Sequence, residues 1–213
     1  MRIFLVFVTC FLFSNISFGQ RFIERNTLID VPGMHVIPKS SYIFVLRMNP
    51  GGQTLLRTKM TPLERLSFGM SIGADNLIGY GTPGFLWDVQ IKYKTRGKLI
   101  SFALGFDSQE YIGVRRGFYA LVGFNLEDKF FPCIGGSYLE EFVPFVGCEF
   151  AWSSRASLIT DCSLIKEEYY LNAGIRWSLT EIAEGLQLEF DFRDLLENIG
   201  INRIMKISYV SSF

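Results

Sequence analysis

The feature that most constrains the fold is a strict alternation of apolar and polar residues along several segments. In the segment 87–94 the apolar residues Trp87, Val89, Ile91 and Tyr93 alternate with Asp88, Gln90, Lys92 and Lys94. The same alternation runs through 168–179 and 186–193. Because successive side chains of a strand point to opposite faces, the pattern predicts strands with one apolar and one charged face. A helix would scatter these charges around its axis.

Further segments with weaker alternation bring the number of candidate strands to about twelve, separated by turns rich in Gly, Asn and Pro. The candidate strands are 40–48, 52–60, 64–74, 85–95, 98–107, 116–125, 131–139, 142–152, 156–163, 166–179, 184–193 and 203–213. Their lengths are close to the ~9–11 residues that a tilted strand needs to cross a bilayer. We therefore predict an all-β fold, a single antiparallel transmembrane β-barrel of about 12 strands, with a range of about 10 to 14 allowed.

The first residues have the form of an export signal. Arg2 precedes an apolar stretch, 3–13, that is too short to cross ~30 Å of hydrocarbon as a helix. The small residues Ser17 and Gly19 then prepare a cleavage site before Gln20. We predict a signal peptide over 1–19, an N-terminal periplasmic segment over 20–39 and an outer-membrane barrel over 40–213, with an uncleaved anchor as the alternative.

Periodicity alone does not separate a transmembrane barrel from a soluble, exported lipocalin-like binder, in which the apolar face would point inward around a cavity. The end of the chain favours the membrane. Its last strand places Tyr209 and Phe213 on one apolar face and ends on Phe213. This arrangement resembles the C-terminal assembly signal of bacterial outer-membrane barrels. It implies the outer membrane of a Gram-negative bacterium, with outer-membrane lipid, lipopolysaccharide and the barrel assembly machinery as partners.

In a barrel of this kind the charged face points into the lumen. The predicted polar network of the lumen contains both signs of charge and consists of Asp88, Lys92, Glu168, Arg176, Glu189, Asp191, Arg193 and Lys206. Such side chains are expected to pair across a small lumen rather than to leave a wide channel. A narrow pore stays open as an interpretation.

The sequence offers little for catalysis. We predict no catalytic, cofactor-binding or metal-binding residues and no enzymatic activity. His35 is the single histidine, so metal sites with several histidines are excluded. An outer-membrane enzyme acting on lipid or peptide, the alternative, would need His35 beside an acid and a hydroxyl. Because 21 basic residues balance 21 acidic ones, nucleic acid is not expected as a partner.

Three cysteines follow the predicted signal peptide, and an exported chain meets an oxidising compartment. A hairpin turning between Glu140 and Glu141 would set Cys133 opposite Cys148, and a turn centred on Arg155 would set Cys148 opposite Cys162. A disulfide between Cys133 and Cys148 is therefore a candidate. The alternative is three small apolar side chains.

Two segments resemble parts of YjbH-like outer-membrane proteins. The segment 26–44, NTLIDVPGMHVIPKSSYIF, looks like the stretch that leads into their first strand, although Gly33, Met34 and His35 depart from the usual Thr-Ala-Arg. The segment 100–111, ISFALGFDSQEY, resembles one of their strand-and-loop regions. The resemblance implies a link to exopolysaccharide production or export and polysaccharide as a partner. We therefore expect a non-enzymatic outer-membrane protein that is structural, envelope-associated or a narrow pore.

Overall fold

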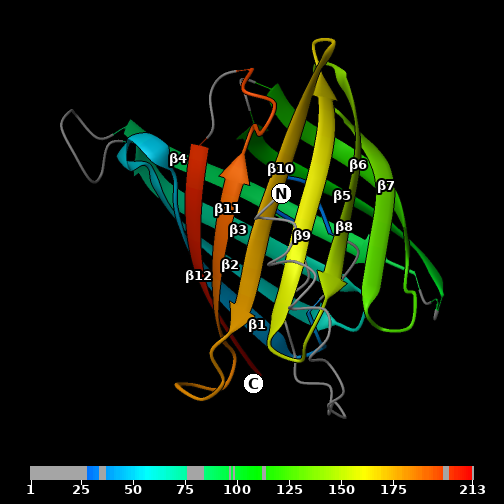
Figure 1. Ribbon diagram of the computed structural model, residues 1–213, viewed down its shortest axis with the longest axis vertical. Coiled ribbons are helices and arrows are strands. Elements are labelled where there is room, and N and C mark those ends of the chain that lie inside the picture. The colour runs from blue at the N-terminus through cyan, green and yellow to red at the C-terminus, as the bar shows by residue number, and fades with distance from the viewer. Residues whose placement is uncertain are drawn as a thin grey trace, which may run out of the picture.

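A computed structural model describes residues 28–33, 37–75, 84–95, 97, 99–111, 114–198 and 202–212. In these residues twelve antiparallel strands form a closed barrel, in which β1 pairs with β12 to complete the ring (Figure 1). The prediction of an all-β antiparallel barrel of about twelve strands is confirmed. No helix within the described residues is long and apolar enough to span a membrane.

The strands lie close to the segments predicted from the alternation. Their bounds are β1 Ser41–Met48, β2 Thr54–Leu63, β3 Leu66–Asp75, β4 Gly84–Lys94, β5 Ile100–Tyr111, β6 Val114–Phe124, β7 Phe130–Tyr138, β8 Phe142–Ala151, β9 Ala156–Ile165, β10 Glu168–Ser178, β11 Leu186–Arg193 and β12 Asn202–Ser212. A short 3-10 turn, η1 (Pro50–Gly52), follows β1.

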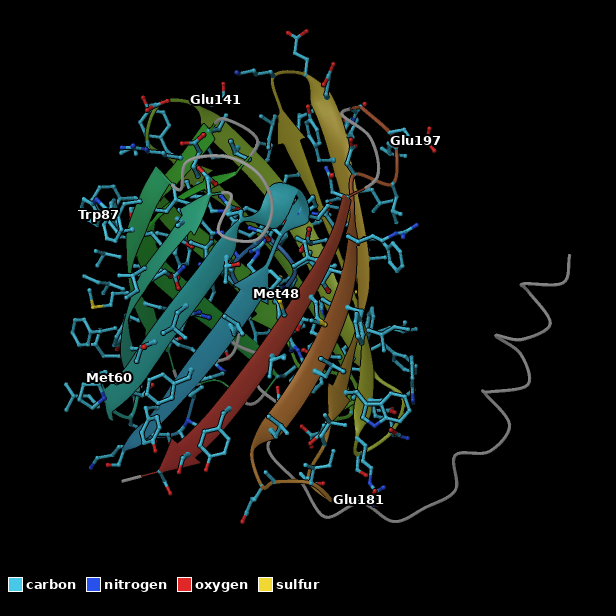
Figure 2. All side chains as sticks on the ribbon, turned by 90° about the vertical axis from the view of Figure 1, so that its left-hand side faces the viewer. Met48, Met60, Trp87, Glu141, Glu181 and Glu197 are labelled. Carbon is cyan, nitrogen blue, oxygen red and sulfur yellow. The ribbon has the colours of Figure 1, made fainter. Side chains whose placement is uncertain are left out.

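The barrel wall is apolar outside and charged inside, the reverse of a soluble protein. On β4, Trp87 is 67% exposed and points away from the barrel, whereas its neighbour Asp88 is 5% exposed and faces the lumen (Figure 2). Most of the large exposed side chains of the strands are aliphatic or aromatic, and many of the buried ones are charged. This polarity contradicts the alternative of a soluble lipocalin-like binder, in which the apolar face would point inward.

Exposed aromatic side chains gather near both ends of the barrel. One group lies near the end that carries the first residue of β1 and the last of β12, and comprises Tyr93, Phe102, Phe130, Trp152, Trp177 and Tyr209. The other lies toward the opposite end and comprises Phe85, Trp87, Phe118, Tyr138, Phe142 and Tyr169. Two such groups are typical of the aromatic girdles at the two membrane surfaces.

We assign the end that carries the first residue of β1 and the last residue of β12 to the periplasm. At the other end β3 stops at Asp75 and β4 starts at Gly84, and β11 stops at Arg193 and β12 starts at Asn202, so the sequence that joins each of these two pairs is long. Long connections are typical of the extracellular side of outer-membrane barrels. The extracellular end of the barrel is therefore the end near Glu141 and Glu197 in Figure 2.

Residues 28–33 belong to the segment 20–39, which we predicted to lie in the periplasm. Residues 28–33, which we call the plug, lie inside the barrel rather than in the periplasm, and Leu28, Ile29, Asp30 and Val31 are all buried. A barrel of about eight strands is filled by its own side chains, whereas a larger one has room for more. Here the plug takes up part of that room. The predicted signal peptide, 1–19, lies outside the described residues.

Candidate functional site: the plugged lumen

Apolar side chains hold one side of the plug against the barrel wall. Leu28, Ile29 and Val31 form a buried cluster with wall residues of β5 to β9, namely Ala103, Tyr119, Leu121, Cys133, Phe145 and Ile159. Gly147 on β8 leaves room for Leu28, because a Cβ atom on this glycine would lie 2.3 Å from Leu28 Cδ1. The wall is therefore shaped to receive the plug at this point.

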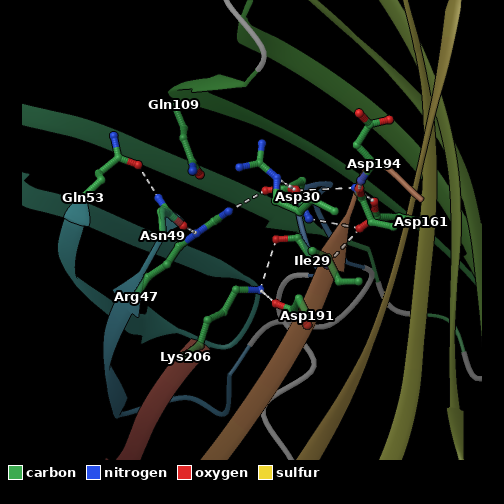
Figure 3. Close-up of polar contacts among 12 residues, drawn as sticks. Ile29, Asp30, Arg47, Asn49, Gln53, Gln109, Asp161, Asp191, Asp194 and Lys206 are labelled. Carbon is green, nitrogen blue, oxygen red and sulfur yellow. Dashed lines mark hydrogen bonds and ion pairs between the residues drawn. The ribbon is translucent and has the colours of Figure 1, made fainter. Parts of the chain in front are cut away.

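The backbone of the plug is bound by polar side chains of the wall. Asp161 Oδ2 on β9 accepts hydrogen bonds from the backbone N–H groups of Ile29 at 2.8 Å and Asp30 at 3.0 Å. Lys206 Nζ on β12 donates to the carbonyl oxygen of Ile29 at 3.1 Å (Figure 3). Lys92 Nζ on β4 donates to the carbonyl oxygen of Gly33. Strands from several parts of the wall thus satisfy backbone groups that burial would otherwise leave unpaired.

The side chain of Asp30 lies between two arginines. Its Oδ1 is 2.7 Å from Arg47 Nη2 on β1, and its Oδ2 is 2.7 Å from Arg193 Nε on β11. Burial by itself would raise the pKa of the Asp30 carboxyl. The surrounding cations, led by Arg193 and Arg47, outweigh this effect and hold the pKa well below its usual range. Asp30 is therefore ionised across the physiological range.

A second group of charges lies along β8, β10, β11 and β12. Arg176 is 2.6 Å from Glu189 through Nε and 3.2 Å from Glu149 through Nη1. Lys206 pairs with Glu189 and lies 2.9 Å from Asp191. All five side chains are buried, so each charge depends on its partners in the lumen.

The predicted lumen residues are placed as follows. Asp88, Lys92, Arg176, Glu189, Asp191, Arg193 and Lys206 all face the lumen. Glu168 does not join them: it is exposed at the extracellular tip of the β9–β10 hairpin, where it accepts a hydrogen bond of 2.8 Å from the Tyr170 hydroxyl. Glu168 is on the same face of β10 as the inward residue Arg176, but it lies at the end of the strand, beyond the charged interior.

Several residues of the polar network in and around the plug were missed in the sequence. They are Asp30, Arg47, Glu149, Asp161 and Asn172. Asp161 and Asn172 occupy the inward positions of their strands, as does Arg47, so the alternation itself carried a signal for them. Nothing in the alternation identified Asp30, which lies outside any strand.

The predicted disulfide does not form. Cys133 faces Gly147, and Cys148 faces Pro132, because the register of the β7–β8 hairpin differs by one residue from the predicted one. Such a slip turns a side chain to the opposite face of the sheet. Cys133 consequently points into the lumen and Cys148 outward, and Cys133, Cys148 and Cys162 are all free thiols.

The remaining residues singled out in the sequence are His35, Tyr209 and Phe213. His35 and Phe213 lie outside the described residues, and Tyr209 is exposed on the outer face of β12. Among the described residues no group of three or more His, Cys, Asp or Glu side chains is arranged to hold a metal ion.

The extracellular mouth contains a cavity of about 220 Å³, which we call the vestibule. Its lining includes Arg47, Asn49, Gln53, Gln109, Arg115 and Arg193. Three deeper gaps beside the plug measure about 10 to 20 Å³ each, room for about one water molecule. The vestibule reaches Arg47 and Arg193, the two arginines that bind Asp30.

This fold and its polarity define a class. A closed antiparallel barrel with an apolar, aromatic-girdled exterior and a charged interior is an outer-membrane β-barrel, because such a barrel pairs its strand backbones internally where lipid offers no hydrogen bonds. The protein is thus an outer-membrane protein of a Gram-negative bacterium.

Comparison with solved structures agrees on the fold. The KdgM porin matches with a TM-score of 0.58 and 9% sequence identity over 81% of this chain and 99% of that chain. The structure of the KdgM porin in complex with disordered oligogalacturonate matches with a TM-score of 0.59 at 9% identity, over the same shares of both chains. No protein-family model and no curated protein sequence matches the chain. At 9% identity the comparison shows a shared barrel fold and no more.

Proposed function

We propose that this protein is a non-enzymatic outer-membrane pore for small polar solutes, closed by its own plug. The observation that carries the proposal is that a short segment outside the strand ladder lies in the lumen. Ion pairs, hydrogen bonds and one apolar cluster hold this segment against the wall.

The lining of the lumen supports this function. Away from the apolar cluster, the wall beside the plug presents charged and amide side chains such as Arg57, Lys59, Asp88 and Gln90, all of which are buried. Arg57 Nη2 on β2 is 3.6 Å from Asp88 Oδ2 on β4, so the two opposite charges pair across the intervening strand β3. If the plug moves away, these side chains become the walls of a hydrated passage that suits polar solutes.

The finer proposal concerns the solute. The resemblance of segments 26–44 and 100–111 to YjbH-like proteins supports a role in exopolysaccharide production or export, with saccharides as solutes. A KdgM porin has been solved with oligogalacturonate, and that solute class is compatible with an arginine-containing vestibule. A strain lacking the gene is expected to release less exopolysaccharide, measured as hexose and uronic acid in the medium. Unchanged amounts would remove this finer proposal and leave the pore.

Conductance in planar lipid bilayers tests the pore itself. The full chain is expected to show little or no conductance, whereas a variant lacking residues 20–33 is expected to form open channels. A boiling-dependent shift in gel mobility shows for each sample that the barrel is folded. A folded variant without the plug that conducts no ions would overturn the proposal and indicate a structural barrel.

A further inference from the structure

We propose that Arg47 and Arg193 form a carboxylate-binding site for acidic saccharides entering from the vestibule, and that Asp30 of the plug occupies this site as an internal ligand. The inference rests on the proposed pore function, because it assigns the class of solute and the event that opens the pore.

The geometry is that of a built anion site. Arg47 and Arg193 come from β1 and β11, the two strands that flank β12, and each places one nitrogen 2.7 Å from a different oxygen of the same carboxylate. The Asp30 side chain is 1% exposed there. Arg47 is in turn oriented by Asn49, whose Oδ1 accepts a hydrogen bond of 2.8 Å from Arg47 Nε. The Arg47–Asp30 contact is a charge-assisted hydrogen bond, a kind that is short and strong, and Arg193 adds an ion pair to the same carboxylate.

The site adjoins the vestibule. Arg47 and Arg193 both line the vestibule and both bind Asp30, so the same two side chains contact the plug and the cavity. Figure 3 shows Arg47 between Asp30 and Asn49. A solute carboxylate that arrives in the vestibule therefore meets the two cations from the side opposite the plug.

The charge balance makes the exchange selective for acids. If the plug leaves without a replacement, buried Arg47 and half-buried Arg193 both lose a carboxylate that lies 2.7 Å away, which is unfavourable. If a solute carboxylate takes its place, the arginines stay compensated and the exchange is nearly balanced. A neutral solute gives no such compensation. A ligand shifts a conformational equilibrium only by its difference in affinity for the two states. Here the states are the barrel with the plug seated and the barrel with the plug displaced, and the solute carboxylate binds the arginines only in the second state.

The rest of the vestibule fits a hydroxylated ligand. Asn49, Gln53 and Gln109 place amide groups beside the arginines, and amides both donate hydrogen bonds to hydroxyl groups and accept them. Arg115 adds a third arginine to the lining, while Asp88 and Glu110 contribute two carboxylates to it. A carboxylate attached to a ring of hydroxyls, as in a uronate sugar, matches this combination.

Binding of D-glucuronate to the full chain in detergent, measured by calorimetric titration, tests the inference, with D-glucose as the neutral probe. The Asp30→Asn variant keeps the shape of the side chain but removes its charge. We expect it to bind glucuronate about tenfold or more tightly than the unmodified protein, since the internal competitor no longer holds the site. The unmodified protein and Asp30→Asn are expected to bind glucose with the same affinity.

Two further variants make the test specific. Asp75→Asn removes a carboxylate that accepts a hydrogen bond of 2.6 Å from Gln53 near the same mouth, so it controls for the general loss of negative charge, and it is expected to leave the affinity unchanged. Adding Arg193→Gln to Asp30→Asn is expected to abolish the gain. Folding of each variant is checked by its heat-dependent gel shift.

Equal glucuronate affinity in the unmodified protein and in folded Asp30→Asn overturns the inference, as does an equal gain in Asp75→Asn. This readout does not depend on conductance. A plug-deleted barrel that stays closed in bilayers would therefore refute the pore while leaving the carboxylate site standing, and an open pore without the affinity gain would do the reverse.

Discussion

Substituting Gly147 by valine is expected to expel the plug without altering any of its residues. Gly147 lies on the inward face of β8, and an added Cβ would lie 2.3 Å from Leu28 Cδ1, well inside van der Waals contact. An alanine at position 147 would require only a shift of the Leu28 side chain, but a branched valine fills the space in which this side chain packs. The β-branched side chain itself is well suited to a strand.

The magnitude follows from the burial of Leu28, which is 3% exposed. Returning a fully buried leucine side chain to water forfeits about 1.5–3 kcal/mol. Because about 1.4 kcal/mol corresponds to a factor of ten, the equilibrium between seated and displaced plug is expected to shift about 10- to 150-fold toward the displaced state.

Thiol labelling measures this shift. Val31 is a buried plug residue, and a Val31→Cys variant without the native cysteines reports plug exposure through its rate of reaction with a polar maleimide. Gly147→Val is expected to raise that rate by the factor given above. Gly69→Val on β3 is the matched control, because an added Cβ there meets the flexible Lys59 side chain rather than the plug. An unchanged rate in folded Gly147→Val would refute the seating of Leu28 against this wall.

Three more predictions concern assembly, pH and stability. Deleting Phe213 is expected to lower the fraction of folded barrel in outer membranes several-fold on a heat-modifiability gel, and full assembly without it would remove the assembly signal. Because the pKa of Asp30 is lowered in the folded state, its contribution is complete above the unfolded value near 4 and is lost only as the pH falls toward the folded value. Bilayer conductance should accordingly stay low from about pH 8 to about pH 5, and opening within that window would contradict the ionised plug. Replacing buried Arg176 by leucine is expected to destabilise the barrel by about 3–5 kcal/mol in denaturant titrations followed by tryptophan fluorescence, whereas Arg155→Leu, which breaks a surface pair with Glu181, should change stability by less than about 1 kcal/mol. Equal effects of the two arginine substitutions would contradict the buried network.

The strands and their faces were predictable because both depend on a local signal. The two-residue period of segments such as 87–94 is imposed by the geometry of a strand, and a lipid exterior forces the apolar set outward. The lumen residues followed from the same alternation, since whatever opposes an outward Trp87 on β4 must face inward.

The plug was not predictable in this way. Leu28, Ile29 and Val31 form a short apolar run without a strand or helix period, and it follows the predicted export signal in the sequence. What places the run in the lumen is a set of contacts with distant wall residues, including Asp161, more than 130 positions away. Pairings of that separation leave no periodic trace in a single sequence.

The register of one hairpin explains the error over the cysteines. The sequence suggested a turn between Glu140 and Glu141, whereas the observed pairing of Tyr138 with Phe142 centres the turn on Glu140. This half-residue difference changes the sum of paired positions by one and separates Cys133 from Cys148 across the sheet. Turn geometry therefore limits what strand prediction alone says about contacts between side chains.

The most direct test of the account is a cross-link between plug and wall in isolated outer membranes. In a chain without its native cysteines, Leu28→Cys is combined with Gly147→Cys, and in a second chain with Gly69→Cys on a distant strand. After mild oxidation, peptide mass spectrometry is expected to find a disulfide between positions 28 and 147 and none between 28 and 69. Absence of the 28–147 link in a folded barrel, with the N-terminal segment open to added protease, would contradict the presence of a plug in the lumen.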